Sequence, residues 1–181
     1  YSKMGRTKYT VIRHSNNYGP YDKFDLERSH VFGATMTKVL GTQDGKIVVW
    51  GDGEEERDLL YISDLVDFVN LTIEKQNAPF CLCNVGSGRS ISVSDLAKKI
   101  ILMSGKKVAI EYDKSKPSIK TSLSLDCTKA KTEFGWNPKV AIDEGIQKTM
   151  DWLQANNCLT SHDNNQNTIE FSCHIFFMFR I

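Results

Sequence analysis

Short runs of apolar residues alternate with longer stretches that have helical spacing. Four runs rich in β-branched and aromatic residues are too short for helices and predict strands at 9–13, 46–50, 80–85 and 108–112. Five stretches repeat apolar residues every three or four positions, which predicts helices at 30–40, 64–75, 92–104, 128–134 and 143–156. Mixed strands and helices without an internal repeat indicate an α/β protein.

Polar and glycine signals mark the ends of several predicted elements. Asp64 is a plausible N-cap for the helix at 64–75, and Ser92 with Asp95 resembles a capping box at the start of the next helix. Gly105 and Gly135 each follow a helical stretch, where glycine commonly terminates a helix.

Composition narrows the class of protein. The 181 residues are 40% hydrophobic and 25% charged, with a formal net charge of +1. This length suits one domain with a core, and the balanced charge gives no electrostatic case for binding nucleic acid or an anionic membrane. The longest apolar stretch, 175–179, is far shorter than the ~20 residues of a membrane span.

The five cysteines are odd in number and irregularly spaced, with no Cys-x-x-Cys pair. They therefore predict neither a metal site nor a disulfide framework, and they indicate a reducing, cytoplasmic location. Residues 158–181 are polar and then aromatic without a clear period, so we expect one domain over 1–157 and an atypical tail of unknown role over 158–181.

The first candidate motif follows the strand at 9–13. It contains Arg13, Asn16 and the turn Tyr18-Gly19-Pro20. Ligands bind at the carboxyl ends of strands in open α/β sheets, and an asparagine there can donate to and accept from a sugar or phosphate group. The alternative is an ordinary turn in which asparagine caps its own backbone and proline fixes φ.

The second motif runs from Trp50 to Asp64 and contains Arg57. A planar guanidinium is well suited to bidentate contact with a diphosphate. Arg57 also follows three glutamates at 54–56, so it could instead balance an acidic, solvated surface.

Two further motifs are less informative alone. Gly86-Ser87-Gly88 lies between a strand and a helix, where glycines let a ligand approach the backbone, although an ordinary loop is the simpler interpretation. The stretch 129–138 has the composition of a short helix with a glycine stop and an aromatic anchor, which predicts a structural role.

Taken in this order, the four motifs resemble the extended short-chain dehydrogenase/reductase family, specifically its NAD-dependent sugar-nucleotide epimerases and dehydratases. The resemblance covers about residues 8–155, and 22–31 are most similar to the GDP-fucose synthase-like branch. It implies the C-terminal part of a Rossmann-type fold with a small mixed α/β substrate-binding lobe. It also implies NAD or NADP as cofactor and a nucleotide-diphosphate sugar as substrate, and a homodimer as a possible assembly.

The resemblance assigns roles residue by residue. It implies that the substrate contacts Asn16, Ser29, His30, Lys38, Trp50 and Arg57. It also implies that Tyr18, Gly19 and Pro20 form the turn beside the nicotinamide. The family often has a substrate-binding arginine after the position of Lys116-Pro117. Here that stretch offers only Lys116 or Lys120.

The family's catalytic tyrosine and lysine lie four apart on one helix, and Tyr1-Ser2-Lys3 does not match that pair. Its glycine-rich cofactor loop is expected far upstream. We therefore expect no catalytic residue in this chain, and a parent enzyme whose cofactor-binding half lies outside it. The alternative is a non-catalytic pseudoenzyme or nucleotide-sugar-binding module.

Overall fold

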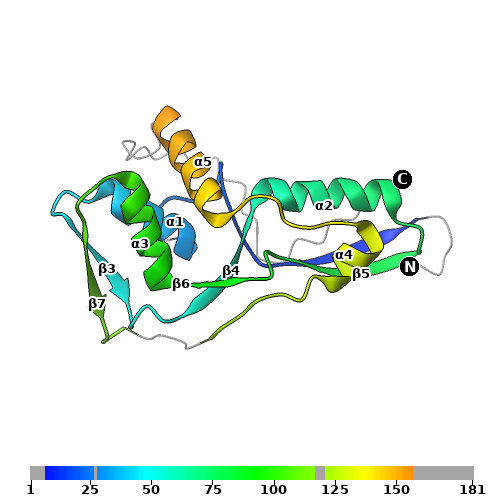
Figure 1. The fold of residues 1–181 in the computed structure, drawn as a ribbon, viewed down its shortest axis with the longest axis horizontal. Helices are drawn as coiled ribbons and strands as arrows, with labels where there is room; N and C mark the ends of the chain where they lie inside the picture. Colours follow the sequence, from blue (N-terminus) through cyan, green and yellow to red (C-terminus); the bar gives the residue numbers. More distant parts are fainter. Residues whose placement is uncertain (1–6, 27, 117–120, 157–181) are drawn as a thin grey trace.

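The structure is a computed structural model, which describes residues 7–26, 28–116 and 121–156. The predicted tail at 158–181 lies outside the described residues. Within them, seven strands and five helices follow one another (Figure 1): β1 Tyr9–His14, β2 Asn16–Tyr18, α1 Val31–Gly41, β3 Lys46–Trp50, β4 Glu56–Tyr61, α2 Ile62–Lys75, β5 Phe80–Val85, β6 Ser90–Ser92, α3 Val93–Ser104, β7 Ala109–Asp113, α4 Thr128–Phe134 and α5 Ile142–Ala155.

The strands form three small sheets. β1 pairs with β5 and β3 pairs with β7, both in parallel. The third sheet has the order β2-β4-β6, in which β2 is parallel and β6 antiparallel to β4. Figure 1 shows α2 and α4 beside β1 and β5, whereas α1, α3 and α5 gather at the other end of the molecule. The predicted α/β class is confirmed.

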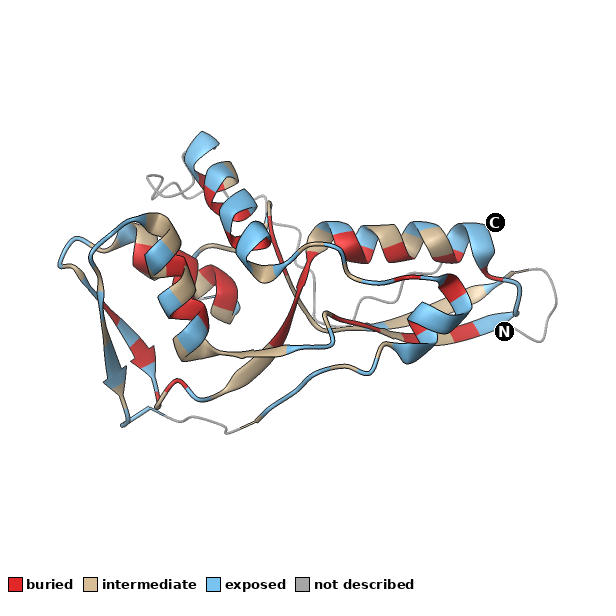
Figure 2. Cartoon of the chain, viewed as in Figure 1, coloured by how far each residue is buried: buried red, intermediate tan, exposed pale blue. Residues whose placement is uncertain are grey.

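β4 joins two hydrophobic clusters because successive side chains of a strand point to opposite faces. Leu59 and Tyr61 pack with α1, α3 and α5, whereas Leu60 packs with α2, α4 and β5. Buried positions line the inner sides of these helices in Figure 2. The strand that carries Arg57 is therefore held from both sides.

Several predicted helix ends are confirmed. The Ser92 hydroxyl accepts a hydrogen bond from the Asp95 amide at 3.0 Å, as an N-cap does. Gly105 and Gly135 end α3 and α4 with φ of 67° and 70°, a left-handed conformation that a side chain would strain. No described helix is long and apolar enough to cross a membrane.

Three predictions about local structure need correction. Asn16 begins a short strand rather than a turn, and Glu56–Tyr61 forms a central strand that the charged motif concealed. Asp64 is not an N-cap, because α2 begins at Ile62 and the Asp64 side chain is buried. Its carboxylate instead accepts hydrogen bonds from the amides of Lys139 and Val140.

Candidate functional site

The pairing of β2 with β4 brings the first two motifs together. Asn16 lies opposite Leu59 and Tyr18 opposite Tyr61 in this parallel register. Arg57 is two residues from Leu59 along β4, so Asn16 and Arg57 belong to neighbouring strands although 40 residues lie between them in the sequence. The pairing depends on contacts distant in sequence, and neither motif reveals it alone.

The Tyr18-Gly19-Pro20 turn is rigidly built. The Tyr18 ring is 2% exposed and packs against Phe32, with ring centroids 4.2 Å apart. Burial, followed by the nearby Tyr61 and Asp64, raises the pKa of the Tyr18 hydroxyl. Gly19 has φ of 144°, and an added Cβ would lie 2.8 Å from Ile62. Tyr18 and Gly19 could therefore offer a cofactor only their backbone.

Several unpaired polar atoms belong to residues close to this turn in the sequence. Among the described residues, four buried side-chain oxygens have no hydrogen-bond partner, and all lie between positions 15 and 29: Ser15 Oγ, Asn17 Oδ1, Asp22 Oδ2 and Ser29 Oγ. Buried polar atoms in proteins are nearly always paired, so each of these oxygens calls for an explanation. Burial also raises the pKa of Asp22, against the opposing effects of the Lys23 amide and His30.

Trp50 and two lysines form a second polar surface at the end of β3. The Trp50 side chain is 60% exposed, and the Lys116 ammonium lies 5.7 Å from its ring centroid. Lys38 donates to the carbonyl of Val48 at 2.8 Å, and burial lowers the pKa of Lys38. An exposed aromatic ring with a cation beside it, as Lys116 is here, can stack a planar group and attract an anion. Lys120, the other predicted basic contact, lies outside the described residues.

Arg57 is held by contacts on both terminal nitrogens. Nη1 donates to the Glu56 carbonyl at 2.9 Å and to Thr121 Oγ1 at 3.0 Å, and Nη2 donates to Glu55 Oε2 at 2.9 Å. The ion pair with Glu55 fits the alternative that Arg57 balances the acidic run. The Arg57 side chain nevertheless remains 27% exposed.

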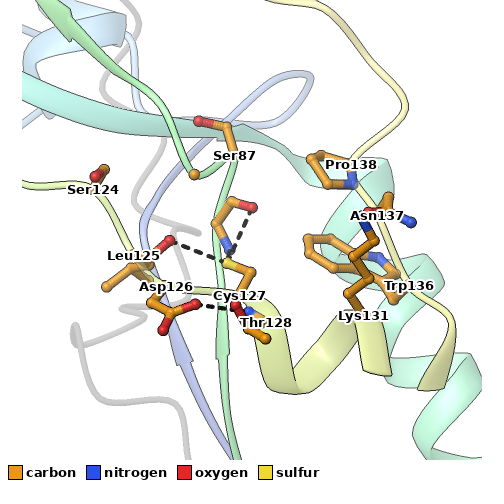
Figure 3. Close-up of a pocket in the computed structure, with 12 residues that line it drawn as sticks. Ser87, Ser124, Leu125, Asp126, Cys127, Thr128, Lys131, Trp136, Asn137 and Pro138 are labelled. Carbon is orange, nitrogen blue, oxygen red and sulfur yellow. Dashed lines mark hydrogen bonds between the residues drawn. The ribbon is translucent and has the colours of Figure 1, made fainter. Parts of the chain in front are cut away.

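The glycine loop at 86–88 already binds an anion from within the chain. The buried carboxylate of Asp58 accepts from the Ser87 and Gly88 amides at 2.7 and 3.2 Å. A cavity of about 450 Å³ borders this loop (Figure 3), with Cys127 opposite Trp136. Since Asp58 takes these amides, the loop is not a free phosphate site. Sequence reasoning missed Asp58, because nothing local to the Arg-Asp pair signals a partner thirty residues away.

Tyr112 and Lys116 have the four-residue spacing of the family's catalytic pair, which the sequence reasoning overlooked. Tyr112 lies in β7 rather than a helix, and its hydroxyl contacts Ser94 Oγ at 2.7 Å. Lys116 instead lies over Trp50. The two residues therefore do not form a helical tyrosine–lysine pair.

The buried cysteines offer no reactive thiol or metal site. Burial, followed by the Cys81 thiol, raises the pKa of Cys83 to about 12. In the part of the chain that the structure describes, no three histidine, cysteine or acidic side chains gather in a way that could hold a metal ion.

Known proteins share this arrangement. Residues 1–86 match the NAD dependent epimerase/dehydratase family. GDP-L-colitose synthase of Yersinia pseudotuberculosis is 37% identical over 149 residues, covering 81% of this chain and 48% of that protein. GDP-L-fucose synthase 1 of Arabidopsis thaliana is 32% identical, covering 80% of this chain and 45% of that protein. The chain thus spans about half the length of these curated relatives.

A solved structure agrees with the sequence matches. UDP-glucose 4-epimerase of Thermotoga maritima, determined with UDP-glucose, has a TM-score of 0.72 at 31% identity, covering 83% of this chain and 47% of that one. The fold is that of part of a Rossmann-type extended short-chain dehydrogenase/reductase. The chain belongs to the NAD-dependent epimerase/dehydratase family.

Proposed function

We propose that residues 1–157 are the substrate-binding half of an NAD(P)-dependent enzyme that epimerises, dehydrates or reduces a nucleotide-diphosphate sugar. The sugar is assigned to Asn16, Ser29 and His30. The nucleotide diphosphate is assigned to Lys38, Trp50 and Arg57. A cytoplasmic location and a homodimer of the whole enzyme are part of this proposal.

The parallel register of β2 on β4 is the observation that carries the proposal, because it joins two motifs that are each ambiguous. Asn16 supplies a side-chain amide on β2, and Arg57 supplies a partly exposed cation on the neighbouring strand. Together they fit a ligand with a neutral polyhydroxylated part and an anionic part. A sugar joined to a diphosphate has both.

The turn at 18–20 fits the nicotinamide end of NAD or NADP. Two of the unpaired oxygens, on Asn17 and Asp22, flank this turn, and polar cofactor groups could pair with them. The cofactor would supply hydride transfer to and from a sugar carbon, while these residues bind and orient the sugar. Relatives support the assignment, since dTDP-glucose 4,6-dehydratase of Bacillus anthracis was solved with NAD at 26% identity.

A thermal-shift titration of the purified chain tests this function. GDP-sugars and UDP-sugars should raise the melting temperature, because a ligand that binds only the folded form stabilises it. Arg57→Ala should reduce the shift, and Lys75→Ala, a basic residue on α2 outside the site, should preserve it. NAD and NADP are parallel ligands. No shift with any nucleotide-sugar, or an equal shift in Arg57→Ala, would refute the proposed site.

A further inference from the structure

Asp58 links three separate segments through one buried carboxylate. Its side chain lies in β4 next to Arg57, and the residue is 4% exposed. Oδ1 accepts from the amide and hydroxyl of Ser87, both at 2.7 Å. Oδ2 accepts from the amides of Gly88 at 3.2 Å and Leu125 at 3.0 Å. These donors all come from the protein, so the Asp58 carboxylate needs no ligand to be satisfied. Its role is to hold the loop at 86–88 and the segment that contains Leu125 in place.

The segment that Asp58 holds is the one that reaches Arg57. Residues 121–125 run beside β4 and form hydrogen bonds with it at successive positions. We call them the 121–125 segment. The Glu56 amide donates to the Thr121 carbonyl at 2.9 Å, and the Ser122 hydroxyl donates to the Glu56 carboxylate. Thr121 Oγ1 accepts from Arg57 at its start, and Leu125 donates to Asp58 at its end.

We propose that Asp58 is a positioning residue for Arg57, which it orients through the 121–125 segment. The inference rests on the proposed function, in which Arg57 binds the diphosphate. Arg57 and Asp58 point to opposite faces of β4, so Asp58 cannot touch a ligand bound by Arg57. The 121–125 segment connects the two faces, because Asp58 anchors one end and the Thr121 hydroxyl orients the guanidinium at the other.

Asp58→Asn isolates the proposed connection with little change of shape. The remaining Asn oxygen can accept from Ser87. The new amide group would face the Gly88 and Leu125 amides, placing donors against donors. The 121–125 segment would lose its anchor at Leu125 and keep its hydrogen bonds with Glu56. Losing the preferred orientation of one charged hydrogen-bonding group should weaken diphosphate binding roughly tenfold.

The experiment is a double-mutant cycle on the 181-residue chain, with GDP and UDP as probes and affinity measured by calorimetry. The four proteins are the unsubstituted chain, Asp58→Asn, Arg57→Ala and the double variant. If Asp58 acts through Arg57, Asp58→Asn weakens binding alone and changes nothing further in the Arg57→Ala background. Ser87→Ala is the matched control. It removes one donor from Asp58 but leaves the Leu125 contact, so affinity should be kept.

Asp58→Asn could instead reduce the affinity by the same factor in the unsubstituted chain and in Arg57→Ala. That result would overturn the inference, because a general loss of structure weakens binding whether or not Arg57 is present. If the chain binds neither probe, or if Arg57→Ala binds as well as the unsubstituted chain, the proposed function itself fails. Should Asp58→Asn not fold, Thr121→Val serves as the second variant. Thr121→Val removes the hydroxyl to which Arg57 donates, so it should weaken binding only when Arg57 is present. Unchanged affinity in Thr121→Val would overturn the inference.

Discussion

Asp64→Ala should destabilise the fold strongly. The residue is 1% exposed, and its two carboxylate oxygens accept from the Lys139 and Val140 amides at 3.2 and 3.1 Å. Alanine would leave two donors without their charged acceptor, at about 1–3 kcal/mol each when buried. Partial access of water to these amides lowers the sum, so we expect a loss of about 3 kcal/mol in the free energy of unfolding.

For a domain of this size, that loss corresponds to a fall in melting temperature of roughly 6–12 °C. Differential scanning calorimetry measures it directly. Asp67→Ala is the matched control, because Asp67 also contacts Lys139, through an ion pair at 2.7 Å between exposed side chains. Exposed pairs contribute little, so Asp67→Ala should scarcely change the melting temperature. If Asp64→Ala lowers the melting temperature no more than Asp67→Ala does, Asp64 does not hold Lys139 and Val140 as described.

Three further predictions concern single residues. Burial raises the pKa of Asp22, so the native state disfavours its carboxylate. Asp22→Asn should therefore raise the melting temperature at pH 7, and a pH series should show this gain shrinking as pH falls toward 3.8, the ordinary pKa. Gly86→Ala should cost roughly 1–3 kcal/mol in chemical denaturation, because the new Cβ would lie 2.6 Å from Asp58 Oδ2. Gly41→Ala, with nothing within 4 Å, should cost nothing. Ser92→Ala should cost about 1 kcal/mol in the same assay through loss of the α3 N-cap, and an unchanged midpoint would contradict the cap.

Elements defined by local patterns were predictable from the sequence. The strand at 46–50 and the helix at 128–134 have the predicted bounds, since turn residues and periodicity mark both. The N-cap at Ser92 was predictable for the same reason, because its partner lies only three residues away.

Features that depend on distant pairing were not predictable. β2 is three residues long and exists only because Asn16–Tyr18 pair with β4. β4 carries charged residues that conceal a strand, and their partners lie in the 121–125 segment and the glycine loop. The sequence thus identified Arg57 as a candidate cation, but not Asp58, whose role depends entirely on the tertiary fold.

Hydrogen exchange with and without a bound nucleotide-sugar tests most directly where the chain holds its ligand. With saturating GDP- or UDP-sugar, exchange should slow at 50–57 and in the 121–125 segment. The loop at 86–88 should stay unchanged, because Asp58 and Cys127 already accept hydrogen bonds from its amides. Slowed exchange confined to 86–88 and 126–128, around the cavity of Figure 3, would contradict the account.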